Sequence, residues 1–383
     1  MKRNRILLLI LWILSLIGIS LRGGPITYEL FFLLTLLPLF SLLYCGLVIF
    51  LFKIFQNVEG ISLTANHPAV FHFTLGNESP VLFAGIRVLF YSSFSSIRGL
   101  SDTVEYELHP HSELRRTTTI VCRYRGEYEI GIKAIMVRDF LNLFTLTFRN
   151  REPLKLKIRP DIIHLDHLKE ASFPRESAAD TPVSPSEADV LVREYVPGDD
   201  PRLISWKVSG AQGRLMVRQR IQEQRQGVMI LLDPHRYHEA MEDYLPLENR
   251  MLETVIALSL YLSEQGIPVE AGIYGPSFER WTLSRSGGFD AFYERLCGYA
   301  FRNDRTMKLL MEEALHSSRI LSSRAVFLIL HAWDDDTALF VERLMQNQIE
   351  VTVCLISEEE TQLPVTRAAV HRIRLSDDLK EVL

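Results

Sequence analysis

The sequence has little cysteine and no excess of positive charge. Its four cysteines lack the two-residue spacing of zinc and redox motifs; they are Cys45, Cys122, Cys297 and Cys354. Reduced thiols are therefore expected rather than a disulfide framework or a zinc site. The 42 basic residues are outnumbered by 47 acidic ones, which gives a net charge of −5. That balance argues against a nucleic-acid-binding protein.

Signatures of catalysis are also missing. There is no Walker A lysine loop and no Rossmann glycine fingerprint, since Ser286-Gly287-Gly288 is only an isolated turn. Pairing His331 with Asp334–Asp336, or Cys297 with a distant histidine, gives no nucleophile, base and orienting group at a recognisable spacing. We therefore predict a protein that is not an enzyme and needs no cofactor.

Two long apolar runs stand at the N-terminus. Ile6–Leu21 has about 16 residues and Leu30–Phe52 about 23, so the second can span a bilayer and the first is marginal. Arg22-Gly23-Gly24-Pro25 between them is a turn by composition. A signal peptide is the alternative, but no small-x-small cleavage site follows and the second run comes at once. We predict a transmembrane hairpin over residues 1–55.

Positive residues predict the orientation of this hairpin. Lys2, Arg3 and Arg5 precede the first run and Lys53 follows the second, whereas the short loop carries only Arg22, balanced by Glu29. The positive-inside rule then places both chain termini in the cytoplasm of a multi-pass protein of the cell membrane. Two helices without a buried charge favour an anchor over a channel.

The next region, residues 56–165, consists of short β-type runs and predicts a small antiparallel sandwich. Arg125-Gly126-Glu127 is a turn signal, which predicts that Glu113–Tyr124 and Tyr128–Arg138 pair as a hairpin. A stretch rich in Ser, Pro and acidic residues follows at 166–189 and predicts a linker.

The C-terminal region, residues 190–383, alternates strands and helices. Strands are expected at 228–232, 268–274, 325–331, 350–356 and 371–375, and helices at 246–265, 288–300, 306–317 and 337–346. This order predicts an α/β domain of Rossmann-like, mostly parallel type, with any ligand at the carboxyl ends of the strands.

A dense polar segment, Val192–Lys207, opens this region. We call it the signature segment, and its candidate interaction residues are Arg193, Glu194, Tyr195, Gly198, Asp199, Arg202, Trp206 and Lys207. Arginine pairs with carboxylates and stacks on aromatic rings, so an internal Arg–Asp–Trp network would fix the loop on its own domain. The same residues suit a docking surface for an acidic partner. The two interpretations are compatible.

The pattern Arg-Glu-Tyr-x-x-Gly-Asp-Asp-x-Arg-x-Ile-x-Trp-Lys, then Gly-Arg-Leu-x-Val-Arg and a strand ending in Asp233, resembles the bacterial family of unknown function numbered 58. The resemblance covers about Asp189 to Leu383. It implies a von Willebrand factor A-like domain and a MoxR-type AAA+ ATPase as the partner protein.

Metal binding does not carry over from the resemblance. A von Willebrand A site needs Asp-x-Ser-x-Ser, because a hard divalent cation takes carboxylate and hydroxyl oxygens. Here the segment reads Asp233-Pro234-His235-Arg236-Tyr237, and the distal loop 286–289 lacks a clear threonine. We predict no metal, with Asp233 and Asp334 as remnants of a degenerate site. Asp233 is expected to cap a turn or to pair with Arg236.

The sequence therefore favours a membrane-anchored, non-enzymatic adaptor. The family resemblance implies that it works with a MoxR-type ATPase in complex assembly or envelope maintenance. The alternative is a Mg²⁺-dependent von Willebrand A ligand-binding domain.

Overall fold

The computed structural model describes residues 2–60, 62–168, 190–195, 204–220, 227–285, 287–316, 318–358 and 366–383. Gly198, Asp199 and Arg202 of the signature segment lie outside the described residues, as do Ser286 and positions 169–189 of the predicted linker. The chain divides into two compact units, Met1–Asp161 and Ile162–Leu383.

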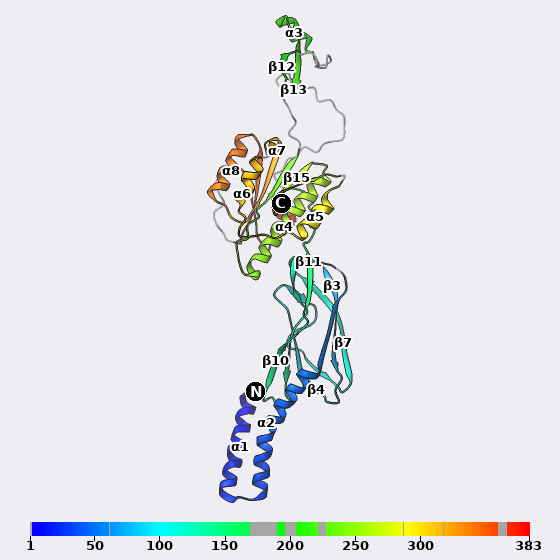
Figure 1. Cartoon of the computed structure of the whole chain (residues 1–383), viewed down its shortest axis with the longest axis vertical. Helices are drawn as coiled ribbons and strands as arrows, with labels where there is room; N and C mark the ends of the chain where they lie inside the picture. Colours follow the sequence, from blue (N-terminus) through cyan, green and yellow to red (C-terminus); the bar gives the residue numbers. More distant parts are fainter. Residues whose placement is uncertain are drawn as a thin grey trace. The chain divides into compact units, whose positions relative to one another are not determined.

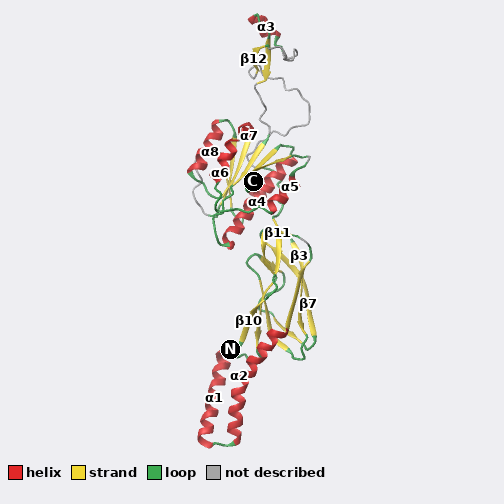
Figure 2. Cartoon of the chain, viewed as in Figure 1, coloured by secondary structure: helices red, strands yellow, loops and turns green. Residues whose placement is uncertain are grey.

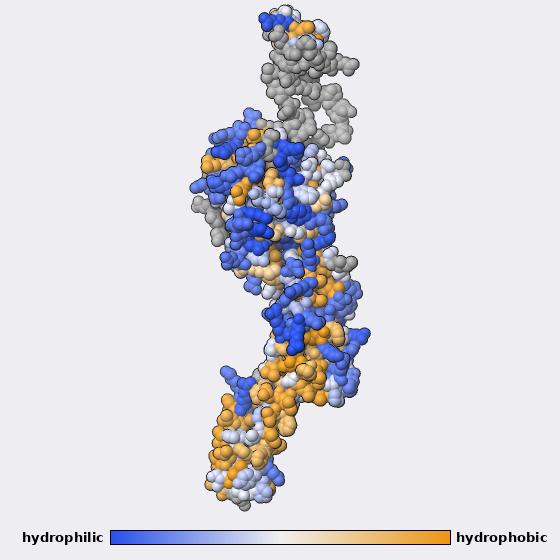
Figure 3. Space-filling view, in the orientation of Figure 1, coloured by the Kyte–Doolittle hydropathy of each residue, from blue (hydrophilic) through white to orange (hydrophobic). Residues whose placement is uncertain are grey.

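The first unit begins with an antiparallel pair of helices (Figure 1). They are α1 (Lys2–Arg22) and α2 (Pro25–Leu51), joined at Gly23, whose φ of 53° suits glycine. Pro25 stands in the first turn of α2, where its missing N–H costs no helical hydrogen bond. Both helices are long and apolar enough to cross a membrane, and apolar side chains cover the visible face of the pair (Figure 3).

The helix pair contacts the β-sheets of the same unit. Strand β1 (Phe52–Val58) follows α2 without a linker, so Phe52 belongs to a strand rather than to the predicted apolar helix. The Tyr44 hydroxyl of α2 donates to the Leu82 carbonyl (3.0 Å) and accepts from the Ala84 N–H (2.9 Å). Asn4, in the first turn of α1, donates to the Leu141 carbonyl (2.9 Å). The N-terminal end of α1 and the C-terminal end of α2 therefore meet the same end of the β-region.

Three sheets make up the described β-region, with orders β1-β3-β7-β5, β10-β9-β4-β6 and β2-β11-β8. All pairings within the first two sheets are antiparallel. The strands are β2 (Leu63–Thr64), β3 (Pro68–Asn77), β4 (Phe83–Phe90), β5 (Ser95–Ile97), β6 (Glu105–Leu108), β7 (Ser112–Cys122), β8 (Gly126–Ile130), β9 (Ile132–Arg138), β10 (Thr145–Arg149) and β11 (Leu154–Arg159). Alternate residues such as Phe71, Phe73 and Leu75 are buried, as the two-residue period of a strand requires.

The hairpin predicted around Arg125-Gly126-Glu127 is wrong. Strand β7 pairs with β3 and β5, whereas β8 pairs with β11. The predicted strand Tyr128–Arg138 is divided at Gly131, which has φ 79° and would place a Cβ 2.6 Å from Gln56 Oε1. That same oxygen accepts the Ile132 N–H (2.9 Å), so the chain passes from β8 into β9 of a different sheet at this glycine.

The second unit contains a six-stranded sheet in the order β16-β15-β14-β17-β18-β19. Only the edge strand β16 is antiparallel to its neighbour. Its strands are β14 (Val228–Leu232), β15 (Val269–Tyr274), β16 (Phe278–Leu283), β17 (Ala325–Leu330), β18 (Glu350–Ile356) and β19 (Ala369–Ile373). The predicted mostly parallel sheet with intervening helices is confirmed, although β16 had not been predicted.

Helices cover both faces of this sheet (Figure 2). Alternate residues of β14 divide between two cores: Val228 and Ile230 pack with α4 (Met241–Glu264) and α5 (Phe289–Cys297). Met229 and Leu231 pack with α6 (Met307–His316) and α8 (Asp335–Gln346). Burial on both sides explains why β14 reads as a continuous apolar run. The remaining short helices are α7 (Ser318–Ser322) and α9 (Leu379–Val382).

The signature segment belongs to a separate small element of the same unit. Strands β12 (Val190–Glu194) and β13 (Met216–Arg220) pair antiparallel, and α3 (Trp206–Gln212) lies between them in the chain. We call these three elements the signature hairpin.

Candidate functional site

The first candidate site is the region at the carboxyl ends of β14 and β17, called the crevice below because ligands of such sheets bind there. Strand β14 is followed in the chain by β15, its neighbour in one direction of the strand order. Strand β17 is followed by β18, its neighbour in the opposite direction. Doubly wound sheets bind ligands where the strand order reverses in this way. Asp233 follows β14, His331 follows β17, and Asp334 precedes α8. The predicted remnants of a metal site thus stand at this reversal point.

Asp233 is fully buried and both of its carboxylate oxygens accept hydrogen bonds. Oδ1 accepts from the backbone N–H of His235 (3.0 Å), and Oδ2 accepts from the hydroxyl of Tyr237 (2.6 Å). Burial raises the pKa of Asp233 above the ordinary value of an aspartate, because desolvation outweighs these two hydrogen bonds. Asp233 therefore caps the turn that follows β14, as predicted.

Arg236 does not pair with Asp233, and that predicted alternative is wrong. Its Nε donates to Glu248 Oε1 (2.6 Å) on α4, and its guanidinium carbon lies 4.0 Å from the ring centroid of Tyr244. The Glu248 side chain is almost completely buried. The positive charge in the loop thus serves to neutralise a carboxylate on the neighbouring helix.

Aromatic rings fill the space around Asp233. The Tyr237 ring meets His235 edge-on at 4.6 Å and His331 at 4.7 Å, and His238 lies 5.8 Å from His331. His235 Nδ1 lies 2.9 Å from the Arg305 carbonyl, and His331 Nδ1 lies 2.7 Å from the Ile356 carbonyl. Because a carbonyl only accepts, each Nδ1 carries a proton. Both imidazoles are thereby fixed in orientation.

Asp334 is occupied as the N-cap of α8. Its Oδ1 accepts from the Thr337 backbone N–H (2.8 Å) and from the Thr337 hydroxyl (2.5 Å). This arrangement satisfies one of the unpaired N–H groups in the first turn of the helix. A helix cap is thus the role that the geometry assigns to Asp334.

The residues of the crevice do not fit a Mg²⁺ ion. Such an ion requires several oxygen ligands with free lone pairs in near-octahedral geometry. The Tyr237 hydroxyl donates a hydrogen bond to Asp233, and Asp334 accepts hydrogen bonds as the cap of α8. His235 stands where a metal site of this type has a serine hydroxyl. Within the described ranges, no three His, Cys, Asp or Glu side chains are grouped so that they would hold a metal ion.

The signature hairpin is the second candidate site. Glu194 pairs with Met216 in the strand register, and the Tyr195 N–H donates to the Leu215 carbonyl (2.8 Å). Ser209 of α3 accepts the Met216 N–H on its hydroxyl (2.8 Å). Val217 is buried with 2% of its surface exposed. These contacts fix α3 on strand β13.

Trp206, the first residue of α3, is 70% exposed. Leu215, just before β13, is also exposed, at 45%. Lys207 follows Trp206 on the exposed side of α3. Asp199 and Arg202, the other members of the predicted Arg–Asp–Trp network, lie outside the described residues, so this network stays a prediction. The sequence identified Trp206 but gave no sign of its exposure.

Other predicted residues are only partly described. Arg193 and Glu194 lie in β12 and have a described backbone only, and Tyr195 follows them half-buried. Tyr237 and Glu248, which hold the crevice together, were not predicted in these roles. The Asp-x-x-x-Tyr spacing was visible in the sequence, but the path of the backbone after β14 was not.

Comparison with known proteins gives one informative match. No curated protein matches the chain. Among solved structures, two crystal structures of a GH20 exo-β-N-acetylglucosaminidase from Vibrio harveyi are similar at 10% identity, one with N-acetylglucosamine and one a D437A inactive mutant. Their TM-scores are 0.17 and 0.18, and each covers 80% of the chain. The chain spans 57% of the first enzyme and 78% of the second. Similarity this weak supports no conclusion about fold or activity.

Residues 191–266 match the family described as "Protein of unknown function DUF58". The matched range begins in β12 and ends just after α4, so it includes both the signature hairpin and the Asp233 crevice loop. The chain therefore carries a domain of the DUF58 family over residues 191–266.

Proposed function

We propose that this protein is a membrane-anchored, non-enzymatic adaptor that binds a partner protein through its signature hairpin. Two N-terminal helices anchor it, the middle antiparallel sheets form a sandwich-like spacer, and the C-terminal domain is of the von Willebrand A-like type. The family resemblance implies a MoxR-type AAA+ ATPase as the partner.

The exposure of Trp206 is the observation that carries this proposal. A tryptophan leaves a large apolar ring in water only at a free-energy cost, and Trp is enriched among the residues that dominate binding energies at interfaces. Here the ring is 70% exposed at the start of α3, within the range matched by the family. Lys207 next to it adds a positive charge suited to an acidic partner surface.

Membrane anchoring follows from the two N-terminal helices. Lys2, Arg3 and Asn4 lie at the end of α1 that contacts the β-region through the Asn4–Leu141 hydrogen bond. Positive residues mark the cytoplasmic end of a membrane helix. Under this proposal both termini are cytoplasmic.

The alternative is a Mg²⁺-dependent ligand-binding domain. It is disfavoured because carboxylate oxygens of Asp233 and Asp334 already accept hydrogen bonds within the chain. Isothermal titration of the full-length protein in detergent distinguishes the two functions. A saturable heat with Mg²⁺ that disappears in Asp233→Ala would favour the alternative.

The docking surface is tested by measuring the affinity of the detergent-solubilised full-length protein for a purified MoxR-type ATPase from the same genome. Trp206→Ala should weaken binding by about tenfold or more, the effect of losing one dominant interface residue. Leu339→Ala is the matched control, because Leu339 is an exposed apolar residue (55%) on α8. Equal affinities for the wild type and Trp206→Ala would refute the docking role of this residue.

A further inference from the structure

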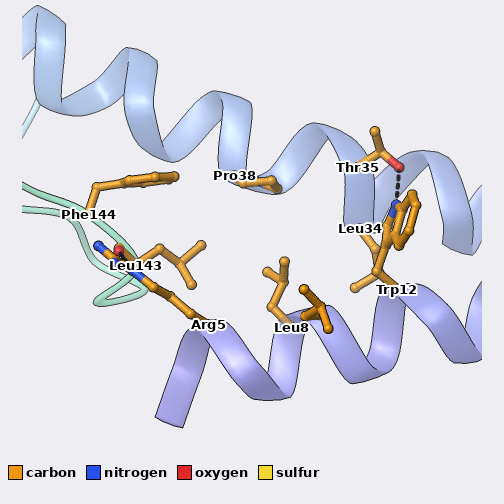
Figure 4. Close-up of a pocket in the computed structure, with 9 residues that line it drawn as sticks. Arg5, Leu8, Trp12, Leu34, Thr35, Pro38, Leu143 and Phe144 are labelled. Atoms are coloured by element: carbon orange, nitrogen blue, oxygen red, sulfur yellow. Dashed lines mark hydrogen bonds between the residues drawn. The ribbon is translucent and has the colours of Figure 1, made fainter. Parts of the chain in front are cut away.

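A groove between the two N-terminal helices has no role in the function proposed above. Its volume is about 530 Å³, within the size range of small-molecule sites. Leu8 of α1 faces Leu34 and Pro38 of α2 across it, and Leu143 and Phe144 of the β9–β10 loop close one end (Figure 4). The walls are almost entirely apolar, so the groove suits a hydrocarbon chain.

The polar groups at the deeper end are already satisfied. The indole N–H of Trp12 donates to the Thr35 hydroxyl (2.9 Å; Figure 4), which in turn donates to the Phe31 carbonyl (2.7 Å). A ligand at this end therefore gains nothing from hydrogen bonding. Trp12 stands seven residues from Arg5, which corresponds to about 10 Å along a helix.

The other end of the groove carries a cation held in a fixed position. Arg5 Nε donates to the Leu143 carbonyl (2.5 Å), and its guanidinium carbon lies 5.8 Å from the Phe144 ring centroid. Within the described ranges the two terminal nitrogens of Arg5 donate to no protein acceptor. Lys2 and Arg3, both exposed, add positive charge at the same end of α1.

Asp139, the acidic residue of the β9–β10 loop, accepts hydrogen bonds from groups other than Arg5. Asp139 is 2% exposed and accepts from the Leu141 N–H (3.0 Å), the Phe144 N–H (2.7 Å) and the Ser41 hydroxyl. These bonds shape the loop so that the Leu143 carbonyl faces Arg5. The Asp139 carboxylate thus stabilises the loop that lines the groove. The Arg5 guanidinium can still bind an anion from outside the protein.

We propose that this groove binds an anionic phospholipid of the cytoplasmic leaflet. One acyl chain lies between Leu8, Leu34 and Pro38, and the phosphate contacts the terminal nitrogens of Arg5. This inference rests on the proposed membrane anchoring, which places Arg5 at the headgroup level and the groove in the hydrocarbon. Basic residues at that level attract anionic headgroups, and a planar guanidinium suits a phosphate group.

The test uses the full-length protein in phosphatidylcholine vesicles that contain brominated phosphatidylglycerol. Bromine on the acyl chains quenches tryptophans within the bilayer, and Trp12 is the one tryptophan in the two membrane helices. The reverse mixture, brominated phosphatidylcholine with plain phosphatidylglycerol, gives the reference. We expect quenching of Trp12 to show a preference for phosphatidylglycerol of about fivefold, because the guanidinium of Arg5 contacts the phosphate directly at the groove.

Variants separate the groove from a general electrostatic attraction. Arg5→Gln should abolish the preference, Arg5→Lys should keep most of it, and Arg3→Gln, which removes the same charge outside the groove lining, should lower it less than twofold. Leu8→Phe fills the groove and should reduce quenching by both brominated lipids.

The outcomes also separate this inference from the membrane anchor. Equal quenching by both brominated lipids, or equal losses in Arg5→Gln and Arg3→Gln, would overturn the lipid site while leaving the anchor intact. An absence of Trp12 quenching with any brominated lipid would overturn the anchor and the lipid site together.

Discussion

The Asp233 crevice and the signature hairpin both lie in the range matched by the family. They differ in whether their characteristic side chains bond within the chain or are exposed to solvent. In the crevice, Asp233, Arg236 and Asp334 each have partners within the chain. In the hairpin, Trp206 is exposed at the start of a short helix. At the usual ligand position of a doubly wound sheet, these side chains therefore bond groups of the chain itself, while a large apolar side chain faces solvent at the hairpin.

This contrast shows that the position of a binding site in a fold does not guarantee its use. The strand reversal between β14 and β17 is present, but a ligand also needs donors or acceptors that are free to bind it. Tyr237 instead donates a hydrogen bond to an Asp233 oxygen that a metal ion would otherwise coordinate. The proposed function accordingly places binding at the hairpin.

The largest effect is expected from removing an internal partner in the crevice loop. Arg236→Leu takes the guanidinium away from the nearly buried Glu248, and should destabilise the C-terminal unit by about 3 kcal/mol, because a buried carboxylate loses its countercharge. Hydrogen-exchange protection of the β14 amides in the full-length protein measures the loss.

Lys308→Leu is the matched control for Arg236→Leu. Lys308 pairs with Asp336 at 3.2 Å, but both side chains are at least half exposed. An exposed pair contributes less than about 1 kcal/mol. Equal effects of the two substitutions would mean that the crevice loop is not held by its internal ion pair, and the comparison with the hairpin would lose its basis.

A smaller effect is expected from the pH dependence of Asp233. Its pKa is raised in the folded protein, so protonation favours the fold. This contribution is fully present below the ordinary aspartate pKa of about 4 and is lost as the pH rises through the folded pKa. The stability of the wild type relative to Asp233→Asn should therefore fall by about 1 kcal/mol from acidic to neutral pH, on the scale of one buried hydrogen-bonded group.

Hydrogen exchange in β14 at several pH values measures this difference between the wild type and Asp233→Asn. An opposite trend, with the wild type gaining stability relative to the variant as the pH rises, would indicate that Asp233 is ionised and paired with a cation. That result would reopen the crevice as a binding site.

The sequence predicted the parallel sheet well, because buried strands such as β14 and β17 carry continuous apolar runs that are hard to mistake. Strand β16 escaped prediction because its alternation is weak: it carries Glu279, Arg280 and Trp281 on a sheet edge with little burial. Which strands pair in the β-region depended on Gly131 and Gln56, two residues 75 positions apart that no local pattern connects.

The candidate sites show the same limit. The sequence itself shows that the Asp-x-Ser-x-Ser oxygens are missing, and the prediction of no metal rests on that loss. The sequence did not show which groups Arg236 and His331 bond. The partner of Arg236 is Glu248 on the following helix, and that of His331 is the Ile356 carbonyl at the end of a distant strand. Residue types predicted the chemistry that each site would need, whereas only the fold determined which groups were already engaged.

The smallest effect on stability is expected at Trp206. Its ring is 70% exposed and contributes little to packing, so Trp206→Ala should change the unfolding free energy by less than about 0.5 kcal/mol. Trp281 is the matched residue in the sheet: its ring packs 5.9 Å from Phe292 and its N–H donates to Glu279 (3.4 Å). Trp281→Ala should cost about 2 kcal/mol of unfolding free energy, since removing a half-buried ring leaves a cavity.

Chemical denaturation of the full-length variants measures the change in unfolding free energy for both Trp206→Ala and Trp281→Ala. A large loss of stability in Trp206→Ala would show that this tryptophan supports its own fold, and the hairpin would then resemble the crevice instead of differing from it.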